Sequence, residues 1–316
     1  MSTPKISVVT PTYNRAYVLG RVYDSLLAQT FDDFEWIVVD DGSSDGTEEL
    51  VQSWAAEGKL DIHFKWQENT GQYAAVNRGV EIARGEYITL LDSDDWFLPD
   101  TLEALLEIWY SIPESERPGF SGAVGLCAYE DGRIVGDRYP EDPLDCDQAE
   151  LYYLHGVQGD KHSLLRTEVL KAYPFPFEGE VVWPGIVWNR MALTYRERHV
   201  NRVVKILDYQ ETGLSNRALE IQIGSPLPMK QYYLEELRLP HRLPLRRRLR
   251  TTANYSRWSF HCGIPLRTQF TDAPSKLGWL ALLPLGFAVY LNDRRRFPEA
   301  FAAHRARLRA AAAKAT

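Results

Sequence analysis

Two hydrophobic periods alternate along the first 92 residues. Short apolar and β-branched runs predict buried strands at residues 6–11, 34–40, 61–67 and 86–92. Between them, apolar residues recur every three or four positions, as in Val18, Val22 and Leu26, and predict helices that end near residues 30, 58 and 84. Strands that alternate with helices imply right-handed crossovers, so we expect an α/β fold with a mostly parallel sheet covered on both faces.

The alternation weakens from about residue 113. Strand-like segments follow at 120–129, 133–140 and 200–210, and a helix is predicted at 185–197. No internal repeat or low-complexity linker precedes the alanine-rich end. We therefore expect the second half to be built onto the same sheet and to hold another substrate.

Polar residues follow each of the first four predicted strands at its carboxyl end. They are Thr12, Tyr13 and Asn14, then Asp40 and Asp41, then Asn69, then Asp92 to Asp95. In open sheets of this kind, ligands bind beyond the carboxyl ends of the strands. Four such ends at one edge predict a shared site more strongly than four unrelated acidic turns.

The stretch ITLLDSDDWFLPD, residues 88–100, places carboxylates directly after a hydrophobic run. In an extended segment Asp92 and Asp94 share one face while Ser93 points away. Two oxygen ligands on a short turn suit Mn²⁺ or Mg²⁺, which usually complete their shell with water and substrate phosphate. A solvated acidic turn is the alternative interpretation.

The cysteines and the N-terminal residues indicate the cellular compartment in which the protein is expected. The three cysteines, Cys127, Cys146 and Cys262, lack CxxC spacing, which argues against a disulfide framework or a zinc site. The first residues, MSTPKISVVTPTYNR, lack the features of a signal peptide. We expect a cytoplasmic protein.

The order and spacing of several stretches resemble the inverting family 2 glycosyltransferases with the GT-A fold. The matching stretches are VVTPTYNR, LLAQTF, FEWIVVDDGSSDGT and RGEYITLLDSDDWFLPD. Later stretches, GDKHSLLRTEVLKAYPFPFEGE, VVWPGIVWNRMA and DYQETGLS, are similar to bacterial exopolysaccharide-type members. The resemblance implies transfer of a sugar from a nucleoside diphosphate sugar, with a UDP-sugar favoured, to an acceptor hydroxyl in cell-surface or exopolysaccharide assembly.

The resemblance also assigns donor-binding roles. It places Pro11, Tyr13 and Asp41 in the nucleobase pocket, makes Asp94 the direct metal ligand, and puts Asp92 near the ribose or metal. We include Ser93, between those two aspartates, in the predicted nucleotide-sugar site.

One departure from the family concerns the diphosphate. Relatives often carry Lys or Arg near Gln72 or Ala74, where this chain has no cation. Arg15 or Arg78 would have to substitute, or the metal alone would neutralise the diphosphate. We place Gln72, Arg15 and Arg78 in the predicted nucleotide-sugar site.

Inversion needs a base on the side of the sugar opposite the metal, in the second half of the chain. Glu178 and Glu180 are the candidates, and Glu180 is preferred; solvation of a loop is the alternative role. Relatives carry a carboxylate just before the GLVWNR-like helix, where this chain has Trp183, Pro184 and Gly185.

For the acceptor, Trp183 and Trp188 could stack on a sugar and Asp160 could bind its hydroxyls, although aromatic residues are more often core.

The chain ends in a basic segment. Residues 240–316 carry 15 Lys and Arg against 3 Asp and Glu, although the whole chain has a net charge of −7. Residues 277–291 form an uncharged run that is short for a membrane span but could lie in the interface, with Trp279 and Tyr290 at headgroup depth. A buried helix is the alternative.

We divide the chain into a glycosyltransferase domain, 1–239, and a helical, basic C-terminal appendage, 240–316. Within the former, residues 1–112 form the nucleotide-binding half and 113–239 the acceptor half. The partners expected are a saccharide or lipid-linked saccharide and an anionic membrane surface at the inner face of the plasma membrane, without nucleic acid.

Two other function classes stay open at this point. A sugar-phosphate nucleotidyltransferase would share a related sheet, but it usually begins with a glycine-rich phosphate loop, which TPTYNRAYVLG lacks. A catalytically impaired nucleotide-sugar-binding subunit of a polysaccharide assembly is the other.

Overall fold

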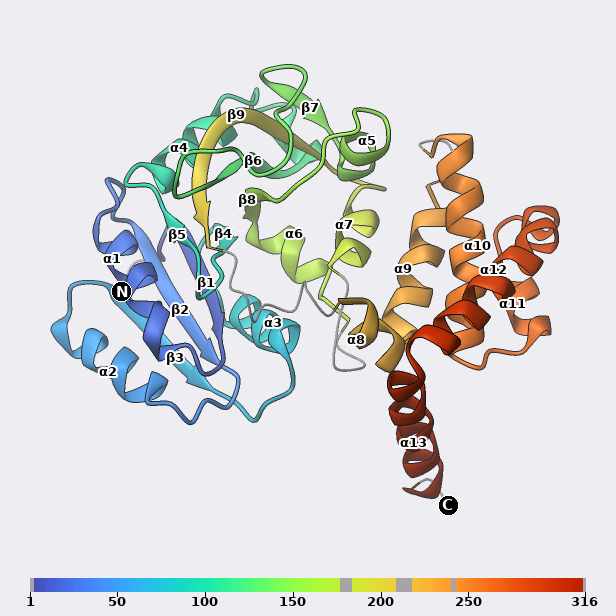
Figure 1. Cartoon of the computed structure of the whole chain (residues 1–316). Coiled ribbons are helices and arrows are strands. Elements are labelled where there is room, and N and C mark those ends of the chain that lie inside the picture. Colours follow the sequence, from blue (N-terminus) through green and yellow to red (C-terminus); the bar gives the residue numbers. More distant parts are fainter. Residues whose placement is uncertain (1–2, 177–183, 209–217, 240–242, 315–316) are drawn as a thin grey trace. The chain divides into compact units, whose positions relative to one another are not determined.

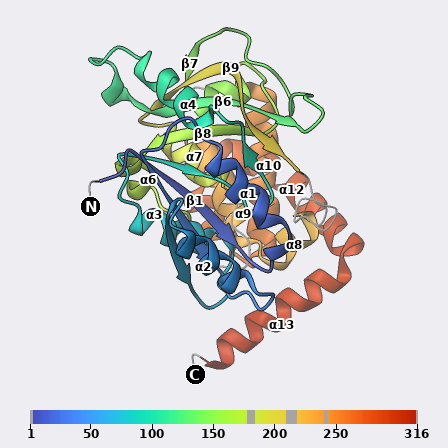
Figure 2. The same cartoon turned by 90° about the vertical axis from the view of Figure 1, so that its left-hand side faces the viewer.

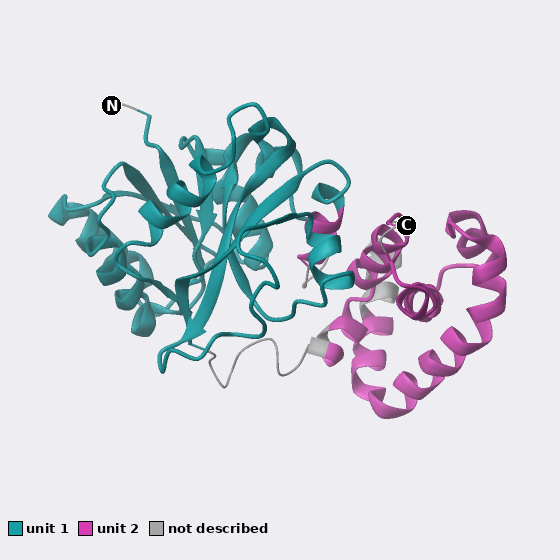
Figure 3. Cartoon of the chain, turned by 90° about the horizontal axis from the view of Figure 1, so that it is seen from above, with its two compact units in different colours: residues 1–175, 190–210 teal, residues 176–189, 211–316 magenta. Residues whose placement is uncertain are grey.

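The computed structural model describes residues 3–176, 184–208, 218–239 and 243–314. The chain forms two compact units, coloured separately in Figure 3. Unit 1 comprises residues 1–175 and 190–210, and unit 2 comprises residues 176–189 and 211–316.

Unit 1 is an α/β unit (Figure 1). Its strands are β1 (Ile6–Thr12), β2 (Phe34–Asp40), β3 (Asp61–Trp66), β4 (Tyr87–Leu90), β5 (Trp96–Phe97), β6 (Phe120–Tyr129), β7 (Leu144–Cys146), β8 (Lys161–Arg166) and β9 (Arg196–Leu207). Its helices are α1 (Ala16–Leu27), α2 (Thr47–Glu57), α3 (Gln72–Ile82), α4 (Thr101–Tyr110), the 3₁₀ turn η1 (Arg117–Gly119), α5 (Gln148–Tyr153) and α6 (Thr167–Ala172). A further helix, α7 (Gly185–Met191), crosses the boundary between the two units.

All of these strands belong to one sheet, in the order β3-β2-β1-β4-β8-β6-β9-β5, with β7 paired to β9. The first four strands pair in parallel, as the sequence predicted. Strand β8 then runs antiparallel between β4 and β6, and β9 pairs in parallel with β6. The second half therefore extends the same sheet, which confirms that part of the expectation; its binding of another substrate stays a prediction.

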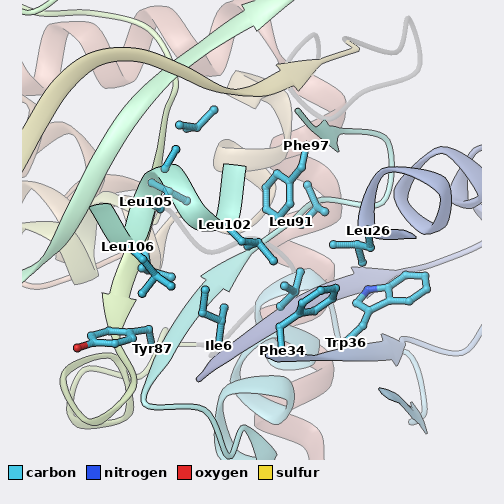
Figure 4. Packing of buried hydrophobic residues seen from close by; sticks show 14 of the residues in the cluster. Ile6, Leu26, Phe34, Trp36, Tyr87, Leu91, Phe97, Leu102, Leu105 and Leu106 are labelled. Carbon is cyan, nitrogen blue, oxygen red and sulfur yellow. The ribbon is translucent and has the colours of Figure 1, made fainter. Parts of the chain in front are cut away.

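Alternate side chains of β1 and β2 point to opposite faces of the sheet and pack against different helices. Ile6, Val8 and Trp36 pack in one buried cluster with α1, α2 and α4, which cover the same face (Figures 2 and 4). Val9 points to the opposite face, where α3 packs so closely that a Cβ on Gly79 would lie 2.3 Å from Val9 Cγ1. This two-sided burial explains why both strands are apolar throughout.

Two predictions for the second half were wrong in detail. Residues 133–140 form no strand; Ile134 makes one isolated bridge to Ala128. The helix predicted at 185–197 ends at Met191, because β9 begins at Arg196, four residues before the predicted strand. Pairing with β6 and β7 extends β9 beyond its apolar core.

Unit 2 is helical over its described residues. Its remaining helices are α8 (Ala218–Gly224), α9 (Leu227–Leu237), α10 (Leu245–His261), α11 (Leu266–Asp272), α12 (Lys276–Arg296) and α13 (Pro298–Lys314). The predicted boundary at 239/240 falls between α9 and α10, both inside unit 2. No helix among the described residues is long and apolar enough to cross a membrane.

Helices α10 and α12 pack closely. A Cβ on Gly286 would lie 2.6 Å from the carbonyl oxygen of Ala253, so α12 needs a glycine at this crossing. Two turns earlier, Trp279 is 3% exposed and packs with Tyr255, while the Tyr290 ring meets His261 edge to face, with ring centroids 5.1 Å apart. The prediction of Trp279 as a headgroup anchor is therefore wrong, because its side chain belongs to the core of unit 2.

Candidate functional site

The loops that follow β1 and β2 are joined by hydrogen bonds. Asn14, in a left-handed conformation with φ 51°, donates its backbone N–H to Ser43 Oγ at 2.8 Å and accepts from the N–H of Ser44 at 2.9 Å. Ser43 in turn donates to Asp40 Oδ1. The polar residues predicted at these two strand ends thus form one connected surface.

Asp41 links the end of β2 to the loop after β3. Its Oδ1 accepts from Gln67 Nε2 at 2.7 Å and from the backbone N–H of Thr70 at 2.9 Å, and its Oδ2 accepts from the N–H of Gly71 at 2.8 Å. The residue is only 3% exposed. Much of its hydrogen-bonding capacity therefore shapes the loop that leads into α3.

Two buried polar atoms lie between these loops without a partner among the described residues. They are Thr12 Oγ1 and Asp40 Oδ2, and the two residues face each other in the register of β1 and β2. Pro11 is buried beside them in β1, whereas Tyr13 is 49% exposed. Since buried polar atoms normally find partners, a bound ligand is a natural source of them here. The exposed Tyr13 ring provides a surface for stacking.

The loop of residues 92–95, called the acidic loop below, contacts the segments that follow β1 and β3. Gln72 Nε2 donates to Asp92 Oδ1 at 3.1 Å, and Arg15 Nη1 lies 3.4 Å from Asp94 Oδ2. Ser93 is buried between them. These contacts join the segments after β1, β3 and β4, and Asp41 joins the end of β2 to the segment after β3; a shared ligand site at this edge stays a prediction.

The carboxylates of Asp92 and Asp94 in the acidic loop repel each other. Burial and the charge of Asp92 raise the pKa of the Asp94 carboxyl, and Arg15 and Lys205 partly offset the rise. Side-chain exposures are 47% for Asp92 and 24% for Asp94, so both remain open to a ligand. Two accessible, mutually repelling carboxylates are a donor set that Mn²⁺ or Mg²⁺ accepts, with phosphate and water completing the shell. The residues present therefore fit the predicted metal.

A buried lysine lies beneath the acidic loop. Lys205 of β9 is 6% exposed, and its Nζ lies 2.7 Å from Asp95 Oδ2 and 3.9 Å from Asp92 Oδ2. Burial would lower the pKa of Lys205, but Asp95 and Asp92 outweigh it and raise that pKa, so the ammonium is charged at neutral pH. The lysine ties β9 to the acidic loop.

The remaining predicted residues lie as follows. Arg78 pairs with Glu81 at 2.5 Å, one turn along α3, so Arg15 is the predicted arginine that contacts the acidic loop. Asp160 is exposed just before β8. Burial, Asp92 and Asp160 together raise the pKa of Tyr73, so both carboxylates lie within electrostatic range of its hydroxyl.

Three predicted residues, Glu178, Glu180 and Trp183, lie outside the described residues. Trp188 is half-buried in α7, in the part of that helix assigned to unit 2. The predicted base and all three predicted acceptor contacts remain predictions.

A second group of potential metal ligands lies at the amino ends of β2 and β3. Ligand atoms of Glu35, Asp61 and His63 lie within 4.8 Å of one another. The guanidinium of Arg84 donates to Glu35 at 2.8 Å and to Asp61 at 2.9 Å, and it lies 2.8 Å from His63 Nε2. A cation of the protein itself already neutralises this cluster, so we assign it a structural role.

Sequence reasoning missed Lys205, Gln67 and Tyr73. One indication of Lys205 was available: it interrupts the apolar run VVKIL, and lysine is almost never buried unless it is paired. Its partner could not be named, because Asp95 lies 110 residues away.

Comparisons with known proteins agree with this geometry. The model of Glycosyl transferase family 2 matches residues 7–170. A Haemophilus influenzae protein described as an uncharacterized glycosyltransferase is 40% identical over 180 residues, which cover 56% of this chain and 68% of that protein. EpsH of Bacillus subtilis, which carries the name putative glycosyltransferase, is 42% identical over 108 residues, covering 34% of this chain and 30% of EpsH. The chain thus spans less than a third of the length of EpsH.

A more distant relative matches a larger share of the chain. It is the GalNAc(5)-diNAcBac-PP-undecaprenol beta-1,3-glucosyltransferase of Campylobacter jejuni, 26% identical over 244 residues, or 75% of this chain and 76% of that enzyme.

Solved structures share the fold. TarS of S. aureus, residues 1–349 in complex with UDP, superposes with a TM-score of 0.61 at 20% identity, covering 94% of this chain and 91% of that one. The mannosyltransferase PcManGT of Pyrobaculum calidifontis, solved with GDP-Man and Mn²⁺, gives a TM-score of 0.54 at 19% identity over 97% of this chain and 87% of that one. These likenesses show the GT-A fold.

Proposed function

Because the chain belongs to glycosyl transferase family 2, we propose that it transfers a sugar from a nucleoside diphosphate sugar to an acceptor hydroxyl, with inversion. The observation that carries the proposal is the position of Asp92 and Asp94, held by Gln72 and Arg15 at the shared edge of four strands. Strand ends of this type are where open α/β sheets bind nucleotides.

The nucleotide would lie over the ends of β1 and β2. Tyr13 would stack on the base, and Asp40 and Asp41 would accept hydrogen bonds from the nucleoside, since Asp40 Oδ2 is buried without a partner among the described residues. A UDP-sugar is our preferred donor. Complexes of TarS with UDP and with UDP-GlcNAc, and of PcManGT with GDP-Man, support this donor class.

The diphosphate would lie against the acidic loop. A divalent Mn²⁺ or Mg²⁺ ion held by Asp92 and Asp94 would supply positive charge for the departing diphosphate. Arg15, whose Nη1 lies 3.4 Å from Asp94 Oδ2, would add a second positive charge in place of the cation that the family resemblance leads us to expect near Gln72. Gln72 here orients Asp92 through a hydrogen bond. Lys205 would keep the acidic loop in position from below.

The second half of the chain would bind the acceptor. Glu180, with Glu178 as the alternative, is the proposed base that removes the proton of the acceptor hydroxyl. Asp160, Trp183 and Trp188 are the proposed acceptor contacts, and Asp160 is exposed just before β8. Residues 1–112 would thus bind the donor and residues 113–239 the acceptor.

We propose a saccharide or lipid-linked saccharide as the acceptor, in cell-surface polysaccharide assembly at the inner face of the plasma membrane. The Campylobacter jejuni relative is named for a PP-undecaprenol substrate, which supports a lipid-linked acceptor. The basic segment 240–316 supports attachment to an anionic surface.

A donor panel tests the proposal. The purified protein is incubated with Mn²⁺ and each of several UDP-, GDP- and dTDP-sugars, and release of free nucleoside diphosphate is measured with and without saccharide acceptors. Transfer or slow donor hydrolysis supports a glycosyltransferase. Exchange of labelled pyrophosphate into a nucleoside triphosphate would instead indicate a nucleotidyltransferase. Binding of a nucleotide sugar without turnover would indicate an impaired binding subunit.

A further inference from the structure

Helix α12 exposes one continuous apolar face. Five large side chains on it are strongly exposed: Leu277 at 81%, Leu280 at 51%, Leu285 at 53%, Phe287 at 43% and Leu291 at 40%. Ala281, Pro284 and Ala288 lie exposed among them. The positions 277, 280, 281, 284, 288 and 291 recur every three or four residues, which is the spacing of one helix face.

The opposite face of α12 is fully used inside unit 2. Trp279, Gly286 and Asp293 lie on it and are buried, each seven residues from the next. Gly286 contacts the backbone of α10, and Asp293 accepts from Arg257 Nε at 2.5 Å and lies 2.9 Å from His261 Nε2. Because α12 is fixed on α10 through this face, only the exposed face is available to a partner.

The exposed apolar face ends in positive charge. Arg294, Arg295 and Arg296 follow directly and are exposed, and Arg295 continues the line of Ala288 and Leu291. No carboxylate among the described residues forms an ion pair with these three arginines. The arginines that do have buried carboxylate partners, such as Arg257, point into unit 2.

We propose that this face of α12 lies in the plane of a membrane interface that contains anionic lipid, with its apolar side chains among the upper acyl chains and Arg294 to Arg296 at the lipid phosphates. This inference rests on the membrane attachment proposed above and deepens it by naming the surface that makes the contact, but it does not depend on sugar transfer. Residues 277–291 would extend about 21 Å along the surface at 1.5 Å per residue. The free face of α12 alone supports the inference: an apolar helix face flanked by arginines suits the interface plane, where apolar side chains reach about 5–10 Å into the boundary between headgroups and acyl chains.

The charges favour lipid over a second copy of the chain. In a symmetric pairing of two α12 helices, the arginines would need carboxylates on the partner's α12. The acidic residue of α12, Asp293, is buried and already bound by Arg257 and His261. An anionic lipid surface supplies the missing negative charge, and its acyl chains supply an apolar phase for the leucines.

Vesicle sedimentation of the full-length protein tests the proposal. Vesicles of phosphatidylcholine alone are compared with vesicles in which about a third of the lipid is phosphatidylglycerol, because anionic lipid should strengthen binding. We expect Leu280→Ser combined with Leu285→Ser to weaken binding to anionic vesicles by about tenfold or more, through lost apolar contact. Replacing Arg294, Arg295 and Arg296 with Gln should lower the affinity for anionic vesicles about fivefold for each arginine replaced. It should also remove most of the preference for anionic lipid.

The matched control is Leu154→Ser combined with Leu193→Ser, two leucines of unit 1 that are 57% and 50% exposed. These changes should leave vesicle binding unchanged, and the thermal unfolding midpoint of every variant should match that of the parent protein. If the variant with Leu280→Ser and Leu285→Ser bound anionic vesicles as strongly as the parent protein does, the proposal would be overturned. The proposal would also be overturned if the parent protein did not bind vesicles but formed dimers, and if the Leu280 and Leu285 changes dissociated those dimers. No donor or acceptor is present, so the outcome is independent of transfer.

Discussion

Lys205 Nζ lies 2.7 Å from Asp95 Oδ2, although the two residues are 110 positions apart in the sequence. Both side chains are buried, with exposures of 7% and 8%. The ion pair joins β9, from the second half of unit 1, to the acidic loop of the first half. The geometry of the proposed metal ligands therefore depends on a strand that a short motif does not contain.

Replacing this lysine should destabilise unit 1. In Lys205→Met the Asp95 carboxylate would stay buried without its cation, and breaking a buried pair in this way typically costs about 3–5 kcal/mol. Urea unfolding measures the loss. The double variant Lys205→Met with Asp95→Leu removes both charges, so we expect it to recover at least half of the stability. A single variant as stable as the parent protein would contradict the structural role of the pair.

Asp94→Ala should abolish transfer and leave the fold intact. The proposed metal site would lose a charged ligand, whereas the strand end would lose a carboxylate that Arg15 contacts only at 3.4 Å. Turnover with Mn²⁺ and circular dichroism are the measurements, and a chelator should affect the parent protein in the same way. The control is Asp24→Ala, on the exposed side of α1. Full turnover of Asp94→Ala in chelator would eliminate the metal hypothesis.

Tyr13 should contribute to nucleotide affinity through its ring alone. Because the side chain is 49% exposed, its removal should leave stability nearly unchanged. Tyr13→Ala should weaken nucleoside diphosphate binding by about 1 kcal/mol, the scale of an aromatic stacking contact, and Tyr13→Phe should retain the affinity. Calorimetric titration distinguishes the two. Equal affinities for the Ala and Phe variants would place the base elsewhere.

Glu180→Gln should eliminate transfer but preserve donor binding, because the proposed base acts on the acceptor hydroxyl. Glu178→Gln is the matched control and should keep most of the activity. Initial rates and donor affinity are measured for both. The reverse pattern would assign the base to Glu178, and full activity in both variants would place the base outside this segment.

Asp293→Asn should destabilise unit 2 in a pH-dependent manner. Burial opposes ionisation of Asp293, but hydrogen bonds from His261 and Arg257 outweigh it and lower its pKa below the ordinary value of 3.8. A carboxyl whose pKa is lower in the folded state stabilises the fold above its unfolded pKa, and that contribution is lost as pH falls through the folded pKa. We therefore expect a deficit of about 3 kcal/mol near neutral pH, shrinking only below about pH 4. A deficit independent of pH down to acid unfolding would argue against the ion pair.

The local pattern of the sequence determined the first half of the fold. Apolar runs predicted β1 to β4, because strands buried on both faces must be apolar throughout. Turn and helix-cap chemistry placed Tyr13, Asp41, Asp92 and Asp94 at the strand ends, and the topology of parallel strands brings such ends to one edge. These features depend on residues close together in the chain, so they could be predicted without coordinates.

Only the tertiary structure decided which of these residues contact one another and which apolar side chains are exposed to solvent. Gln72 with Asp92, Arg15 with Asp94 and Lys205 with Asp95 are pairs whose partners lie far apart in sequence, and spacing carries no information about them. In α12, Trp279 and Leu280 are adjacent and similarly hydrophobic, yet one is 3% and the other 51% exposed. Composition cannot distinguish them, because the buried face of a helix is fixed by the surface it packs against, here α10.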